Sequence, residues 1–254
     1  YQDYWWRELA NPSQQTAREA KLMRTLQAQL GERGQAAKDF DALEAVLLAE
    51  LKAHGHHALA GRTAPLRELM LWRNQTPRSY DVELPEGPQR VRVELLDEFV
   101  SLGWGAYGRC ERGSTGGWAT EEALFAVVPS YKEGLDSELF RVVFLAHEAQ
   151  HFADKHRFPG LADWELEYRA KLVELIYAST TLSNKRLHGF MTAQGNSPDA
   201  PHPYANARMV AALRERLEME PDQAPLPQLQ AAAREELLAD SRRLSARRRP
   251  NPSQ

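Results

Sequence analysis

The apolar residues of the N-terminal part recur three or four positions apart, which is the spacing of one helix face. Two such runs stand in the first 54 residues: Leu22, Met23, Leu26 and Leu30, then Phe40, Leu43, Val46, Leu47 and Leu51. Ser13 can cap the first helix, and "GERG" at residues 31–34 ends it. A third, short helix is expected over "PLRELMLWRNQ", residues 65–75.

Prolines and glycines interrupt the chain after residue 76, and the pattern then becomes that of strands. "RVRVELL", residues 90–96, alternates apolar and polar positions, as a half-buried strand does. The glycine-rich stretch 103–117 predicts a loop or hairpin. A second strand is expected in "EALFAVVPSY", residues 122–131, where Pro129 ends it.

The C-terminal half returns to helical spacing. Four helices are expected there, over residues 136–156, 163–182, 204–219 and 226–246. Asp136 or Ser137 can cap the first of them, and Asp163 the second, after the break at "FPG".

The order of these elements predicts an α+β protein that is mostly helical and has one small sheet. Three regions are expected: N-terminal helices over 1–76, a central domain over 77–220, and a C-terminal helix with a basic tail over 221–254. The tail "RRRPNPSQ", residues 247–254, is typical of a solvated, disordered end.

Composition narrows the functional classes. The chain has 254 residues, 43% of them hydrophobic and 26% charged, with a net charge of −3. That charge predicts no general attraction to nucleic acid, and runs such as "ALFAVV" are too short to span a bilayer. The single cysteine, Cys110, rules out an internal disulfide and a cysteine-based zinc cluster, and nothing around it indicates a catalytic thiolate.

The first residues of the chain, "YQDYWW", form an aromatic cluster without an initiator methionine. Such a start favours a mature exported protein, periplasmic or secreted, over a cytoplasmic one. A free thiol fits either compartment.

Candidate chemistry is concentrated in "VVFLAHEAQHFADKH", residues 142–156, which contains His147, Glu148 and His151 in the order H-E-x-x-H. Residues four apart share one face of a helix, so the two imidazoles can hold one zinc ion. Glu148 stands beside that face and can act as the general base toward a water molecule.

A catalytic zinc ion usually takes three protein ligands and one water. The metzincin pattern would need glycine and histidine at positions 154 and 157, where this chain has Asp154 and Arg157. From the residues alone, the candidates for the third ligand are Glu165, Glu167 and Glu174 on the next helix, and Asp154 one turn after His151. Glu165 could instead pair with Arg169, and Glu174 with Lys171, as helix-surface charges. Asp154 could have a supporting or surface role rather than bind the metal.

Two further segments carry a family resemblance. "EYRA" at 167–170 resembles the "EYxAD" segment of gluzincin metallopeptidases of the HtpX and CAAX-prenyl-protease type, and "HPYANAR" at 202–208 resembles their "HPPxxxR" segment. With H-E-x-x-H, three segments stand in the family's order, between about residues 120 and 215. The resemblance implies a zincin-like fold over 77–220, a zinc ion, and Glu167 as its third ligand.

The chain departs from that family at several points. Lys171 stands where the family has aspartate, Tyr204 replaces the second proline, and only 16 positions separate His151 from Glu167. The transmembrane helices of many members are absent from the sequence pattern. A soluble, compact variant of the same site plan is therefore expected.

The resulting hypothesis is a zinc metalloendopeptidase that acts on polypeptides. His202 or Tyr204 would stabilise the oxyanion of the attacked peptide group, and Arg208 would anchor the site. The strand at residues 123–128 would bind substrate as an edge strand by β-augmentation, although a buried strand fits the same pattern.

Two other hypotheses stay open: a zinc-binding sensor or regulator of the same fold without general proteolysis, and a helical interaction module in which H-E-x-x-H is accidental. The histidines of "HGHH", residues 54–57, are expected at a solvated helix end, because their spacing fits no defined zinc helix.

Overall fold

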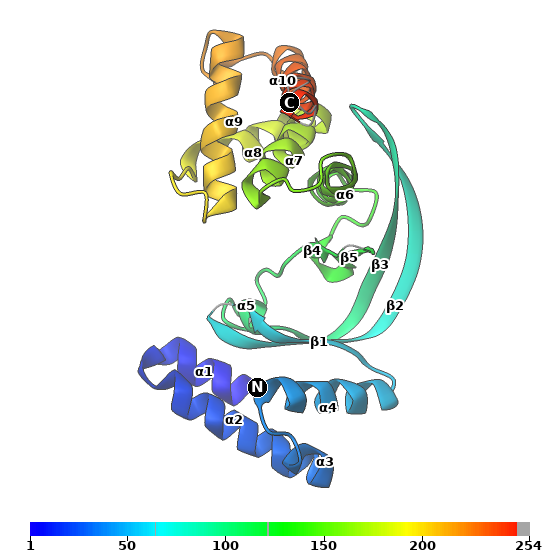
Figure 1. The fold of residues 1–254 in the computed structure, drawn as a ribbon, viewed down its shortest axis with the longest axis vertical. Coiled ribbons are helices and arrows are strands. Elements are labelled where there is room, and N and C mark those ends of the chain that lie inside the picture. The colour runs from blue at the N-terminus through cyan, green and yellow to red at the C-terminus, as the bar shows by residue number, and fades with distance from the viewer. Residues whose placement is uncertain (64, 121, 248–254) are drawn as a thin grey trace, which may run out of the picture. The chain divides into compact units, whose positions relative to one another are not determined.

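The structure, a computed structural model, describes residues 1–63, 65–120 and 122–247 and is a mixed α+β fold in which helices predominate (Figure 1). The chain divides into two compact units. The first unit comprises 1–78, 94–117 and 125–132, and the second comprises 79–93, 118–124 and 133–254. The domain limits at 76/77 and 220/221 stay a prediction. Most of the tail at 247–254 lies outside the described residues.

The first unit begins with short helices. They are α1 (Gln2–Ala10), the 3-10 turn η1 (Pro12–Gln14), α2 (Gln15–Gln29), α3 (Gly31–Gln35) and α4 (Phe40–Ala53). The two predicted helices are confirmed as α2 and α4, whereas α1 and α3 were not expected. Ser13 does not cap α2: it lies in η1, where its backbone N–H donates to the side chain of Asn11. Asp39 caps α4 by accepting from the N–H of Ala42 at 2.8 Å.

Aromatic residues of α1 join the apolar stripes of α2 and α4 in one core. Its buried members are Tyr4, Trp5, Leu22, Leu26, Ala37, Phe40, Leu43 and Leu66. Trp5 is 2% exposed, and its indole N–H donates to the carbonyl of Arg67 at 2.7 Å, so its polar edge is satisfied. The aromatic start of the chain therefore has a packing role in this unit.

The helix predicted over 65–75 is wrong, because this segment is part of the strand β2 (Leu66–Leu84). Its buried positions alternate: Leu66, Glu68, Met70 and Trp72. β2 pairs antiparallel with β1 (His57–Thr63), from His57 opposite Trp72 to Thr63 opposite Leu66. Glu68 is buried within this pattern because its carboxylate accepts from the backbone N–H groups of Leu69 and Trp104.

Within the described residues, the sheet has five strands in the order β1-β2-β3-β5-β4. β3 (Gly87–Leu102) contains the strand predicted at 90–96, and β5 (Leu124–Val127) confirms the second predicted strand. The glycine-rich stretch holds the short helix α5 (Trp104–Tyr107) and the start of β4 (Gly117–Ala119).

The edge-strand prediction for residues 123–128 is wrong, because β5 lies between β3 and β4 in the sheet. Both of its neighbours occupy the backbone groups that an added peptide would need. Leu124, Ala126 and Val127 are fully buried, as in an internal strand. The 3-10 turn η2 (Val128–Ser130) follows, with Pro129 inside it.

The second unit is mainly helical. It contains the π-helix η3 (Leu139–Ala146), α6 (His147–Arg157), α7 (Asp163–Tyr177), α8 (Thr180–Thr192), α9 (Pro201–Leu217), the 3-10 turn η4 (Pro221–Gln223) and α10 (Leu226–Arg247). The helix predicted over 136–156 is thus a π-helical segment followed by an α-helix. The helices predicted at 204–219 and 226–246 are confirmed within a few residues.

The helix predicted over 163–182 is divided into α7 and α8. Ala178 and Ser179 between them are extended, with ψ values of 140° and 169°. Glu138 holds this break by accepting from the backbone N–H of Ser179 at 2.7 Å and from its hydroxyl at 2.6 Å. A carboxylate 41 positions away therefore decides where the helix ends.

Helix α7 is the central element of this unit and packs against α6, α9 and α10. Every residue from Tyr168 to Ile176 is buried, so neighbouring helices surround it over this length. Among the described residues, no helix is both long and apolar enough to cross a membrane.

Candidate metal centre

The two histidines of the H-E-x-x-H segment open helix α6. The preceding π-helix η3 is apolar and buries Phe140, Phe144 and Leu145, which fixes the start of α6 in the core. His147 is the first residue of α6 and His151 stands one turn later, so both side chains leave the helix on the same face. Each residue keeps 9% of its surface exposed.

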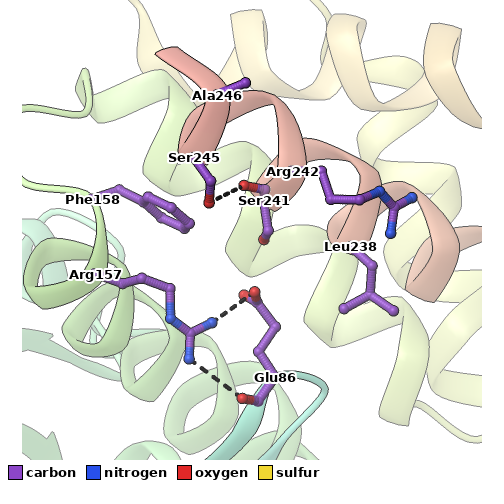
Figure 2. A pocket seen from close by; sticks show the side chains of 8 residues that line it. All are labelled: Glu86, Arg157, Phe158, Leu238, Ser241, Arg242, Ser245 and Ala246. Carbon is purple, nitrogen blue, oxygen red and sulfur yellow. Dashed lines mark hydrogen bonds and ion pairs between the residues drawn. The ribbon is translucent and has the colours of Figure 1, made fainter. Parts of the chain in front are cut away.

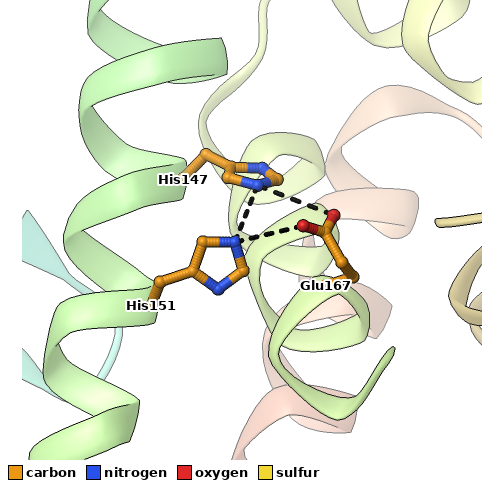
Figure 3. Close-up of side chains that lie close together, drawn as sticks. All are labelled: His147, His151 and Glu167. Carbon is orange, nitrogen blue, oxygen red and sulfur yellow. Dashed lines mark hydrogen bonds and ion pairs between the residues drawn. The ribbon is translucent and has the colours of Figure 1, made fainter. Parts of the chain in front are cut away.

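Glu167, on the first turns of α7, faces both imidazoles (Figure 3). The Nε2 atoms of His147 and His151 lie 3.0 Å apart. Oε1 of Glu167 lies 3.3 Å from Nε2 of His151, and Oε2 lies 3.7 Å from Nε2 of His147. Among the described residues, this is the one group of three or more potential ligands whose atoms lie within 4.8 Å of one another.

These separations match the chemistry of a zinc ion. Two ligand atoms that are each 2.0–2.2 Å from one tetrahedral ion stand about 3.3–3.6 Å apart. The distances of 3.0 Å between the two Nε2 atoms and 3.3 Å between Nε2 of His151 and Oε1 lie near that range, and the 3.7 Å contact of His147 is to the other oxygen, Oε2. Two imidazoles and one carboxylate are also a donor set that zinc takes in catalytic sites. His147, His151 and Glu167 could therefore hold a metal ion such as zinc.

The other ring nitrogen of His147 is held by a buried acid. Nδ1 of His147 lies 2.7 Å from Oε1 of Glu174, which is fully buried. Arg186 of α8 pairs with both oxygens of Glu174, its Nη2 at 3.0 Å from Oε1. A proton on Nδ1 can be donated to this carboxylate, which would leave Nε2, on the side of Glu167, as the atom that binds a metal.

Sequence reasoning considered Glu174 as a ligand and did not single out Arg186. Glu174 follows Glu167 by seven residues, two helical turns, so both acids lie on the same face of α7. This seven-residue spacing is visible in the sequence and was enough to place Glu174 on the same helix face as Glu167. No comparable signal exists for Arg186, because the turn between α7 and α8 brings it back to Glu174.

Two cationic or donor side chains surround Glu167. Lys171, one turn later on α7, pairs with Oε2 of Glu167 and is only 3% exposed. Nδ1 of His202, at the start of α9, lies 2.8 Å from the same oxygen, while its side chain is 67% exposed. His202 therefore joins the candidate centre through Glu167, and it reaches the solvent.

Burial and hydrogen bonding act in opposite directions on the pKa values of this group. Burial alone would lower the pKa of His147, but the carboxylates of Glu167 and Glu174 outweigh it and raise the pKa to about 9. Burial alone would raise the pKa of Glu167, but hydrogen bonds from His147, His151 and His202 hold it well below its usual range. Without a metal, the centre is thus a cluster of ion pairs.

The other acidic candidates lie elsewhere. Glu165 accepts from the backbone N–H of Ala162 at 3.0 Å, at the start of α7, and pairs with Arg247. Asp154 is fully buried and pairs with Arg169 at 2.8 Å. Neither acid belongs to the group of convergent ligand atoms.

The remaining candidate residues have simpler surroundings. Glu148 is half-buried at the second position of α6, beside His147. The hydroxyl of Tyr204 accepts from Arg208 at 2.6 Å, and its ring packs edge-on against Trp164. In the described part of the chain, no carboxylate pairs with Arg208, so the expected anchoring by an acid is not found there.

A cavity of about 670 Å³ opens elsewhere in the same unit (Figure 2). It is lined by Glu86, Arg157, Phe158, Leu238, Ser241, Arg242, Ser245 and Ala246. Glu86 and Arg157 face each other there in an ion pair of 2.6 Å, which leaves the acid engaged. None of the convergent ligand residues lines this cavity, so its size does not bear on the metal centre.

The chain matches no protein-family model, no curated protein and no solved structure in the three comparisons made.

Proposed function

We propose that this chain is a zinc-dependent metallopeptidase in which His147, His151 and Glu167 hold the metal. The observation that carries the proposal is the convergence of two Nε2 atoms and a carboxylate oxygen within 4.8 Å, on two packed helices. The acid on Nδ1 of His147 supports it further, because such acids orient the histidine ligands of zinc.

A zinc ion in this position would lower the pKa of a bound water molecule and polarise a substrate carbonyl. Glu148 stands next to His147 and outside the ligand group, and we assign to it the uptake of the water proton. His202, exposed and hydrogen-bonded to Glu167, is the group best placed to donate to a developing oxyanion. Tyr204 is the weaker candidate, because its hydroxyl is engaged with Arg208.

A zincin-like arrangement of the second unit belongs to the same proposal. Its support is the succession of an H-E-x-x-H helix and a following helix that carries the third ligand, as in the gluzincin resemblance. The substrate class we propose is polypeptide. Strand β5 has no part in substrate binding, since both of its edges are paired.

The proposal is tested by metal analysis and by one substitution. Purified protein should contain about one zinc ion per chain, because the described residues form one such group. Glu148→Gln should keep that zinc and lose about 10²–10⁴-fold in the cleavage of an unfolded polypeptide, because an amide does not take up the proton. A protein without zinc, or a Glu148→Gln variant as active as the parent, contradicts the proposal.

One observation favours a second candidate, a zinc-binding regulator without general proteolysis. The side chains of His147, His151 and Glu167 keep only 11%, 11% and 12% of their surface exposed. A centre this enclosed limits the access of a polypeptide chain. Stoichiometric zinc together with no cleavage of unfolded polypeptides would decide for this candidate.

A further inference from the structure

The two oxygens of the Glu167 carboxylate have different surroundings. Oε1 lies 3.3 Å from Nε2 of His151, on the side where the ligand atoms converge. Oε2 is contacted by the ammonium group of Lys171 and, at 2.8 Å, by Nδ1 of His202, while Nε2 of His147 lies farther from it, at 3.7 Å. The two donors come from different helices, α7 and α9.

A carboxylate oxygen offers two lone-pair directions, and Oε2 meets two donors. Lys171 and His202 are the two nearest donors to Oε2 and occupy both directions, whereas Oε1 faces His151 and has neither of these donors. Nζ of Lys171 also lies 3.2 Å from Nδ1 of His202, so the two donors crowd the same oxygen from neighbouring positions.

Lys171 has little freedom to move away from Glu167. It is 3% exposed, it follows Glu167 by four residues on the same helix face, and its ammonium lies 6.0 Å from the ring of Phe190. Within the described residues, Glu167 is the one carboxylate that pairs with it. Separating the pair would leave a buried, uncompensated charge, which is strongly unfavourable.

We propose that Lys171 and His202 block Oε2 of Glu167, so that this glutamate binds a metal through Oε1 alone and the metal keeps an open coordination position. The inference rests on the proposed metal centre, and it assigns a positioning role to Lys171. This lysine stands where the gluzincin family that the chain resembles has aspartate. Lys171 touches no metal and no substrate in this role.

The proposal fixes the direction in which a substitution acts. Lys171→Met removes one donor and one positive charge beside the metal. Oε2 becomes available as an additional ligand, and the repulsion between the ammonium and a divalent ion is lost, so metal binding becomes tighter. A lysine that only maintained packing would give unchanged or weaker binding after its removal.

Cobalt(II) titration of the full chain provides the test, because its visible absorption weakens as the ion goes from four-coordinate to five-coordinate. Lys171→Met should bind Co²⁺ at least about tenfold more tightly than the parent and absorb less per bound ion. Lys171→Arg should keep the parental spectrum, since its guanidinium also donates to Oε2. Lys185→Met, the same change at an exposed lysine of α8, should behave as the parent.

His202→Ala gives a second, independent measurement. Its side chain is mostly exposed, so the change removes a donor to Oε2 without opening the core. The visible absorption per bound Co²⁺ should fall, as it should in Lys171→Met. If Lys171→Met does not fold, His202→Ala alone tests whether Oε2 is blocked. Unaltered spectra and affinities in both variants would overturn the blocking of Oε2. A parent chain that binds no Co²⁺ would instead overturn the metal centre itself.

Discussion

Nδ1 of His147 lies 2.7 Å from Oε1 of Glu174, and this contact joins α6 to the buried face of α7. The acid holds the ring so that Nε2 faces the other two candidate ligands, His151 and Glu167. Glu174→Gln should therefore lower zinc affinity about 10–100-fold, the usual effect of removing such a partner. Competition with a chromophoric chelator measures the affinity. Glu165→Gln, the same change at the start of α7, is the matched control and should leave the affinity as it is.

Glu167 and Glu165 provide a sharper comparison, because they stand two residues apart and face different neighbours. Glu167→Ala removes the carboxylate that converges with the two histidines and should abolish stoichiometric zinc binding. Glu165→Ala removes a hydrogen bond to the N–H of Ala162 and should retain the zinc. Elemental analysis of the purified variants measures both. The opposite result would move the third ligand to Glu165 and remove the basis of the "EYRA" resemblance.

Local periodicity was sufficient to predict the elements whose pattern depends on near neighbours. The stripes that begin at Leu22 and Phe40 became α2 and α4, and the H-E-x-x-H spacing placed His147 and His151 on one face. The segment at 65–75 was predicted as a helix because its apolar residues fit both a helical and an alternating pattern. The buried Glu68 conceals the alternation, and the backbone N–H groups of Leu69 and the distant Trp104 explain that burial.

The surroundings of the candidate ligands depend on contacts that no local pattern encodes. Arg186 reaches Glu174 because the chain breaks at Ser179, and Glu138 holds that break from 41 positions away. His202 meets Glu167 through the packing of α9 against α7. The grouping of His147, His151 and Glu167 was foreseeable from spacing and resemblance, whereas the contacts of Arg186 and His202 with the acids of α7 were not.

Arg169 is a buried junction in the second unit. It is fully buried and pairs at 2.7–2.8 Å with Glu86, Asp154 and Asp240. Arg169→Met should lower the free energy of unfolding by about 3–5 kcal/mol, because it leaves Asp154 buried without its cation. Urea unfolding followed by circular dichroism measures the loss.

Arg247→Met is the control for that experiment. Arg247 is 69% exposed and pairs with Glu165 at 3.3 Å, and exposed pairs contribute little. It should therefore shift the unfolding midpoint far less than Arg169→Met does. Equal shifts in the two variants would show that the buried junction adds nothing beyond an ordinary surface pair.

Glu236 connects α10 to two neighbouring helices and predicts a pH dependence. Its carboxylate accepts from the hydroxyl of Tyr168 at 2.9 Å, from Arg243 at 2.8 Å and from Arg216 at 2.6 Å. Burial alone would raise the pKa of Glu236, but these hydrogen bonds outweigh it and hold the pKa below its usual value.

A pKa that is lower in the folded chain stabilises the fold above the unfolded-state pKa, which is about 4.3 for glutamate. That contribution is lost as the pH falls through the folded-state pKa. Glu236→Gln should therefore be less stable than the parent at neutral pH, and the difference should shrink as the pH falls below about 4.3. Urea midpoints measured across that pH range test this prediction.

Glu235→Gln is the control, because its side chain is 67% exposed, and it should show no such trend. A difference between Glu236→Gln and the parent that stays constant with pH would mean that the charge of Glu236 contributes no stability.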